Sequence, residues 1–183
     1  LFDRVAEARV LSNNLSAGLF GAMVETARTY GGGAVAVEDT VTGTLTRKRL
    51  LISARVLGRR FAAITEPGEA VGVLLPNANG AVVTFFGLQS GGRIAAMLNY
   101  TSGPANIASA VRTAKIRTIV SSRAFIEKAE LGDLVTAIDG TGAKILWLEE
   151  VRETISTQEK LEAALLWSRP LHPVKPEDAA VIL

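Results

Sequence analysis

The sequence predicts an α/β fold in which a mostly parallel sheet is flanked by helices, with a helix and a β-hairpin in front of it. From residue 67 onward, short continuous apolar runs alternate with helical patterns, and this alternation is typical of right-handed βαβ units in doubly wound folds. Apolar residues make up 48% and charged residues 21% of the 183 residues, a composition typical of one globular domain.

The first part of the chain predicts one helix followed by a hairpin. Residues 15–30 carry apolar side chains one turn apart, which favours a helix, and the three glycines at 31–33 end it. Residues 34–38 and 44–46 are short β-prone runs around a turn that contains glycine, so they predict the two strands of a hairpin.

Residues 47–64 form the clearest amphipathic helix, because apolar side chains recur at spacings of three and four. Two interpretations of its basic side chains stay open: a surface that binds phosphate or RNA, or a solvated helix face. No aromatic residue interleaves with these charges to stack on bases, so we favour the solvated face. The basic residues are Arg47, Lys48, Arg49, Arg55, Arg59 and Arg60.

The central part predicts four strands separated by three helices. The run 71–75 has no charged or polar side chain, as expected for a strand that is covered on both faces. Pro104 is well placed to begin a helix. The other strands are predicted at 94–98, 118–120 and 144–148, and the helices at 78–90, at 104–114 and at 123–130.

The last part predicts a helix, an extended connector and a final strand. Ser156 and Glu159 have the spacing of a capping box, which favours a helix that runs to Trp167. Three prolines space the connector, and the apolar run 179–183 predicts a fifth strand. The chain thus divides into an opening helix and loop (1–33), a hairpin and long helix (34–66), a βαβ core (67–169), and a connector with the last strand (170–183).

Residues that follow the strands are the candidate site residues, because ligands of parallel sheets bind beyond the carboxyl ends of the strands. We expect Asn77, Asn99, Tyr100 and Ser121 to line a substrate or nucleotide cleft. For Asn99 and Tyr100 a second interpretation stays open, in which their side chains cap the turn that follows.

Several classes of chemistry lack the residues that they require. The chain has no cysteine, and its single histidine, His172, lies in a proline-spaced connector and is predicted to be a surface residue. Disulfides and cysteine nucleophiles are therefore excluded, and a zinc site or a Ser–His triad lacks partners. No phosphate-binding loop motif, catalytic residue, metal ligand or membrane span is predicted, and a net charge of +2 gives no argument for nucleic acid.

The run from Gly68 to Asn77 resembles the early strand of the AMP-binding, adenylate-forming superfamily, which includes acyl-CoA synthetases, luciferases and peptide-synthetase adenylation domains. The following helix, small-residue segment, short strand and asparagine, residues 85–99, stand in the order of that family. Residues 176–183 resemble the strand that leads into the family's Ser/Thr/Gly-rich phosphate loop. The resemblance implies a partial, N-terminal portion of an acyl-CoA-synthetase-like fold.

Within this superfamily, residues 93–101 and 122–128 are similar to the acyl–acyl carrier protein synthetase branch, often named 2-acylglycerophosphoethanolamine acyltransferase. Met97 stands where typical members have proline, and Tyr100 follows the asparagine. The resemblance implies a ligase that uses ATP and Mg²⁺ to activate a fatty acid as an acyl-adenylate. The acyl group then passes to acyl carrier protein and onward to a lysophospholipid. It also implies a cytoplasmic location, or the cytoplasmic face of the inner membrane through other parts of the protein.

The chain stops inside the apolar run 179–183, so we expect a truncated domain whose phosphate loop and catalytic residues lie after Leu183. We expect the isolated chain to be inactive and to bind no cofactor. Its mean hydropathy of +0.27 predicts exposed apolar surface and self-association. Two other functions stay open: a standalone module that binds a nucleotide or anion at helix N-termini, and a scaffold whose helix 47–60 binds acyl carrier protein.

Overall fold

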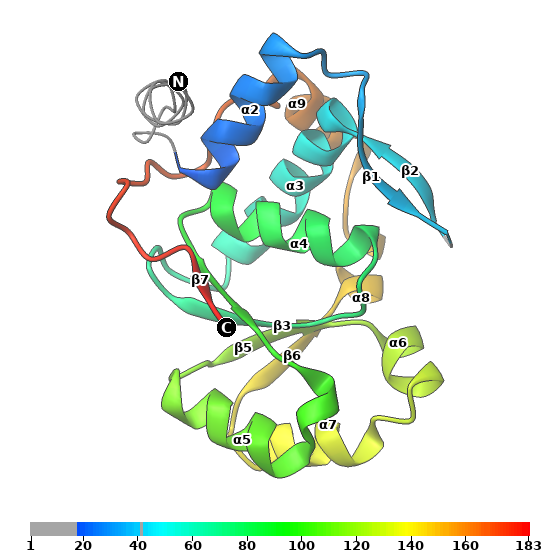
Figure 1. The fold of residues 1–183 in the computed structure, drawn as a ribbon, viewed down its shortest axis with the longest axis vertical. Helices are drawn as coiled ribbons and strands as arrows, with labels where there is room; N and C mark the ends of the chain where they lie inside the picture. Colours follow the sequence, from blue (N-terminus) through cyan, green and yellow to red (C-terminus); the bar gives the residue numbers. More distant parts are fainter. Residues whose placement is uncertain (1–17, 41) are drawn as a thin grey trace, which may run out of the picture.

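The computed structural model describes residues 18–40 and 42–183, and Figure 1 shows how they are arranged. A parallel sheet lies between two groups of helices, and a separate two-stranded hairpin lies beside the first group. The elements are α2 (Leu19–Thr29), β1 (Val35–Asp39), β2 (Gly43–Thr46), α3 (Arg47–Ala62), β3 (Ala70–Leu74), α4 (Asn79–Ser90), β4 (Ile94–Met97), η1 (Tyr100–Ser102), α5 (Pro104–Thr113), β5 (Thr118–Ser121), α6 (Arg123–Lys128), α7 (Gly132–Asp139), β6 (Lys144–Trp147), α8 (Leu148–Glu153), α9 (Thr157–Leu165) and β7 (Val181–Ile182).

The five-stranded sheet has the order β6-β5-β3-β4-β7, and every neighbouring pair is parallel. The chain leaves the central strand β3 for β4 on one side and then crosses back to β5 on the other side. This reversal is the mark of a doubly wound sheet, so the predicted fold class is confirmed. The predicted hairpin is also confirmed, because β1 pairs with β2 in antiparallel register.

Each face of the sheet is covered by its own helices and has its own apolar core. Residues of α3 and α4 pack with Val71, Val73 and Val120 on one face. Residues of α5 and α7 pack with Leu74 and Ile119 on the other face. Figure 1 shows α2, α3 and α4 on one side of the strands and α5 and α7 on the other. The continuous apolar pattern of β3 follows from this burial on both faces.

The predicted helices are present, with three differences. The opening helix begins at Leu19, and residues 15–17 of the predicted range lie outside the described residues. The helix expected at 123–130 is α6, which ends at Lys128 because Glu130 adopts a left-handed backbone with φ of 53° before the next helix begins. Neither α7 nor the short α8 was predicted, since their apolar patterns are too short to indicate a helix.

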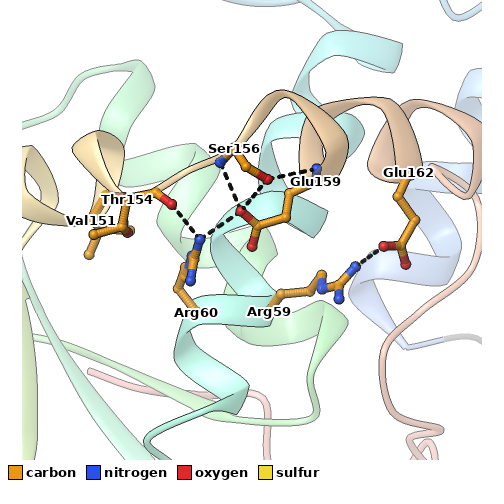
Figure 2. A network of polar contacts seen from close by, with 7 residues as sticks. All are labelled: Arg59, Arg60, Val151, Thr154, Ser156, Glu159 and Glu162. Carbon is orange, nitrogen blue, oxygen red and sulfur yellow. Dashed lines mark hydrogen bonds and ion pairs between the residues drawn. The ribbon is translucent and has the colours of Figure 1, made fainter.

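Three of the basic side chains of α3 make internal contacts, whereas Lys48 and Arg49 are exposed as the sequence predicted. Arg59 pairs with Glu162, and Arg60 donates to Glu159 and to the carbonyl of Thr154, as Figure 2 shows. Arg55, which is buried, donates to the carbonyl of a residue in the connector after α9. The solvated-face interpretation is therefore wrong for these three arginines, because α9 and its flanking loops pack against them.

The predicted capping box of α9 is confirmed and has a second role. Ser156 Oγ accepts from the backbone N–H of Glu159, and the Glu159 carboxylate accepts from the backbone N–H of Ser156 at 2.8 Å. The same carboxylate accepts from Arg60 at 2.7 Å. The Glu159 side chain thus stabilises the N-terminus of α9 and connects α9 to α3 (Figure 2). Within the described residues, no helix is both long and apolar enough to cross a bilayer.

Candidate functional site at the carboxyl edge of the sheet

Strands β3, β5 and β6 end at the same register position, so the loops that follow them lie together at the carboxyl edge of the sheet. Leu74, Ser121 and Trp147 are register partners across β3, β5 and β6. A cavity of about 730 Å³ lies beside this edge, between α3, the β3–α4 loop, and the α8–α9 segment. Its walls are mainly apolar and include Leu45, Val56, Leu57, Leu75, Val83 and Leu148. The size and lining are typical of a site that holds the apolar part of a small molecule.

None of the four predicted site residues lines this cavity. Ser121 is at the edge, but it is completely buried and its hydroxyl donates to the carbonyl of Leu74 at 2.8 Å. That hydrogen bond joins β5 to β3, so the side chain has a structural role. Asn77 is exposed in the loop after β3.

Asn99 takes the second of the two roles considered for it, a cap of the following turn, whereas Tyr100 makes an aromatic contact instead. Asn99 Oδ1 accepts from the backbone N–H of Thr101 at 3.1 Å and from its hydroxyl at 2.8 Å, so it caps the short helix η1. The half-buried ring of Tyr100 packs edge-on against Phe125, with 5.1 Å between the ring centroids. These contacts fix the β4–α5 loop.

Asn79, which was not among the predicted site residues, connects the hairpin to the start of α4. Its side-chain amide donates to Thr42 Oγ1 at 2.8 Å and to the Gly43 carbonyl at 2.9 Å. Its backbone N–H donates to Asp39 Oδ2 at 2.9 Å, and the hydroxyl of Thr42 donates to the same oxygen at 2.6 Å. The carboxylate of Asp39 thus occupies the N-terminus of α4, where the helix dipole favours a negative charge.

A second carboxylate, Glu149, occupies the start of α6. Glu149 Oε1 accepts from Ser122 Oγ at 2.6 Å and from the backbone N–H of Ala124 at 3.4 Å. Burial alone would raise the pKa of Glu149, but the hydrogen bonds from Ser122 and from nearby backbone N–H groups outweigh it, so the pKa lies below its ordinary value. Asp39 and Glu149 lie in no sequence motif that would mark them, because their contacts with the starts of α4 and α6 join residues at least 25 positions apart.

These two carboxylates limit what the edge can bind. Two helix N-termini at the cavity, those of α4 and α6, already hold a negative side chain. An anion would be repelled there, which argues against a standalone anion-binding module. In the part of the chain that the structure describes, no three His, Cys, Asp or Glu side chains come together to hold a metal ion. The described residues therefore offer no cluster that would hold a metal ion by protein side chains alone. The internal contacts of Arg55, Arg59 and Arg60 argue against a basic helix that is free for acyl carrier protein.

Comparison with known proteins defines the class. The family model "AMP-binding enzyme" matches residues 23–183, and the chain belongs to this family. The fold is similar to VinN in complex with 3-methylaspartate, with a TM-score of 0.69 and 20% identity over 91% of this chain. It is also similar to the N-terminal subdomain of NpsA from Klebsiella oxytoca (TM-score 0.69, 16% identity, 92% of this chain). A benzoate CoA ligase from Burkholderia xenovorans LB400 matches 75% of this chain with a TM-score of 0.62 and 18% identity.

The chain spans less than half of each of these proteins: 43% of VinN, 38% of the NpsA structure and 28% of the benzoate CoA ligase. At these identities the likeness concerns the fold. The adenylate-forming family and the parallel α/β sheet predicted from the sequence are thus confirmed, and members of this family are ligases.

Proposed function

We propose that this chain is the front part of an ATP-dependent ligase that activates a carboxylic acid as an acyl-adenylate. The observation that carries the proposal is the position of β7. It pairs in parallel with β4, through Ala95 with Val181 and Ala96 with Ile182, although the connector before it is extended. A parallel edge strand directs the residues after it to the carboxyl edge of the sheet, where ligands of such sheets bind.

The chain's own residues contribute one wall of an activation cleft. The apolar cavity lies at the same edge, and Asn79 and Glu149 hold the helices that frame it. ATP would supply the adenylyl group that joins the carboxylate, with pyrophosphate as the leaving group, and Mg²⁺ would offset the phosphate charge. Because residues 176–183 resemble the strand that leads into the family's phosphate loop, we propose that ATP and Mg²⁺ are held mainly by residues outside this chain.

For the substrate we propose a fatty acid, followed by transfer to acyl carrier protein and then to a lysophospholipid such as 2-acylglycerophosphoethanolamine. This finer assignment rests on the sequence of residues 93–101 and 122–128, including Met97 in place of proline. One solved neighbour is described in complex with L-aspartate and another as a benzoate CoA ligase, which supports a carboxylate as the class of substrate. The acceptor is tested by supplying the activated acyl group with acyl carrier protein or with coenzyme A and comparing the thioester formed.

The activity test compares this chain with the full-length protein. Each is given ATP, Mg²⁺ and a long-chain fatty acid, and pyrophosphate release is measured. We expect turnover by the full-length protein and none by residues 1–183. Turnover by the short chain would refute the assignment of the catalytic residues to later segments. The source gene gives a second test. If no Ser-, Thr- and Gly-rich segment ending in lysine follows Leu183, the proposal that the family's phosphate loop lies there is wrong.

We also propose that the isolated chain self-associates through the open edge of β7. Val181 and Ile182 are 40% and 39% exposed, and an edge strand with exposed apolar residues is a template for pairing. Sedimentation analysis over a range of concentrations tests this. Replacing Ile182 with Lys should restore a monomer, because a charge on an edge strand disfavours pairing.

A further inference from the structure

The last turn of α4 holds a segment that lies far away in the sequence. Gln89 is only 7% exposed, and its side-chain amide donates to the carbonyl of Ala180 at 2.7 Å, across 91 positions. The same nitrogen lies 3.4 Å from the carbonyl of Arg93. The carbonyl of Ala180 also accepts from the backbone N–H of Ala95 at 3.0 Å. One buried amide therefore reinforces the first rung of the pairing between β4 and β7.

The strand β7 needs such support because it is short. It has two residues, and both side chains are partly exposed. A strand that buries little apolar surface has a weakly specified register, and a slip by one residue reverses which side chains face the core. The connector before it contains prolines, which lack the N–H that a ladder needs.

The same turn also holds the connector. The carbonyl of Ser90 accepts from the backbone N–H of Leu171 at 2.7 Å and of His172 at 3.0 Å. Gly92 has a φ of +70°, and a Cβ at that position would lie 2.8 Å from His172 Cδ2. His172 is therefore packed on this turn and is half-buried, so its predicted surface position is only partly correct.

We propose that Gln89 is a positioning residue that sets the register of β7 and thereby the place of the residues that follow Ile182. The inference rests on the proposed function in one respect, namely that those residues contact ATP. Gln89 is not itself a catalytic residue. Its amide is the only side-chain donor on Ala180 among the hydrogen bonds of the described residues, so its loss removes a specific constraint.

The first test uses Gln89→Glu in the present chain, followed by NMR of the Val181 and Ile182 amides. A protonated carboxyl donates a hydrogen bond to the Ala180 carbonyl, whereas the carboxylate has no proton to donate. We expect displaced signals at neutral pH that return to the wild-type positions as pH falls through the pKa of the new side chain. A packing defect would not recover on protonation. Gln158→Glu, on the exposed face of α9, is the matched control and should leave β7 unchanged.

The second test uses Gln89→Leu, which removes the donor at similar size. We expect amide exchange in residues 180–183 to rise on the order of tenfold, the effect of one hydrogen bond, while exchange in β3 and β5 is unchanged. Unchanged exchange in residues 180–183, or β7 signals in Gln89→Glu that do not follow pH, would overturn the proposal. If amide exchange rises throughout Gln89→Leu, that variant has lost global stability. The pH response of the β7 signals in Gln89→Glu then decides the proposal.

The functional readout uses the same Gln89→Leu change in the full-length protein. We expect a higher KM for ATP with little change in the KM for the carboxylic acid. If the exchange of β7 rises and the KM for ATP does not, the link to ATP is wrong. If the full-length protein releases no pyrophosphate at all, the proposed function fails, and the exchange and NMR results decide the role of Gln89 by themselves.

Discussion

Helices α4 and α9 both pack against α3, but by different means. The α3–α4 contact is close and apolar: a Cβ on Gly58 would lie 2.7 Å from the carbonyl of Gly87, and Leu88 is completely buried. The α3–α9 contact is mainly polar, with Ala163 as the one buried side chain of α9 and two Arg–Glu pairs beside it. Helix α4 therefore belongs to the core, whereas α9 is attached to its surface.

The two contacts also respond to different conditions. Apolar burial contributes roughly 25 cal/mol per Å² and depends little on salt or pH. The ion pairs of α9 are partly exposed, with side-chain exposures of 38% and 42% for Arg59 and Glu162, so salt and pH weaken them. We therefore expect α9, which forms one wall of the cavity, to loosen before the sheet does.

The largest expected effect comes from one change made on each helix, Leu88→Ala on α4 and Leu165→Ala on α9. Leu88 is completely buried, so its truncation should lower the free energy of unfolding by about 3 kcal/mol through lost burial and a cavity. Leu165 is 81% exposed, so the same change should cost less than about 0.5 kcal/mol. Urea unfolding measures both values, and equal losses would contradict the distinction between the two helices.

The next effect concerns the close approach of α3 and α4. Gly58→Ala places a Cβ 2.7 Å from the Gly87 carbonyl and 2.5 Å from Ser90 Oγ, so we expect a loss of about 2 kcal/mol despite alanine's better helix propensity. Gly80→Ala in the first turn of α4 is the control. Its Cβ would lie 3.9 Å from Leu148, and we expect a gain of about 0.5 kcal/mol. Thermal unfolding of both variants should show shifts of opposite sign.

A smaller effect is expected from Arg60→Ala, which removes the pair with Glu159 and the hydrogen bond to the carbonyl of Thr154. The group is about one-third exposed, so we expect a loss of about 1 kcal/mol that shrinks at high salt. Amide exchange should increase in α9 and not in β3. Arg49→Ala, on the exposed part of α3, serves as the comparison and should leave α9 protected.

The smallest effect is the pH dependence of α9. Hydrogen bonds from the backbone and hydroxyl of Ser156, aided by Arg60 and Arg59, hold the pKa of Glu159 below its ordinary value in the folded chain. A carboxyl with a lowered folded pKa stabilises the fold above its unfolded pKa, and this contribution disappears as pH falls through the folded value. We expect α9 amides to lose protection in that acidic range. Glu159→Gln should remove the dependence, and Glu153→Gln should not.

Sequence patterns predicted the edge of the sheet at which the candidate site lies, but not the residues that line its cavity. The edge of the sheet was located correctly, because a short apolar run followed by a polar residue marks the end of a parallel strand. The residues at the cavity were not found, because Asn79 contacts the distant hairpin turn at Thr42 and Gly43, and Glu149, after β6, contacts Ser122, after β5. Such partners carry no periodic signal, so no local pattern distinguishes them from surface residues.

The strands, the hairpin, the long helices and the capping box of α9 could be predicted from the amino-acid sequence, because they depend on apolar spacing and on residues within one turn of each other. The contacts of the α3 arginines with α9, and of Gln89 with Ala180 before β7, could not be predicted, because they depend on how the whole chain packs. These contacts join segments about a hundred residues apart. A buried polar group takes whichever partner the packed chain brings to it, and that partner is set by the fold as a whole.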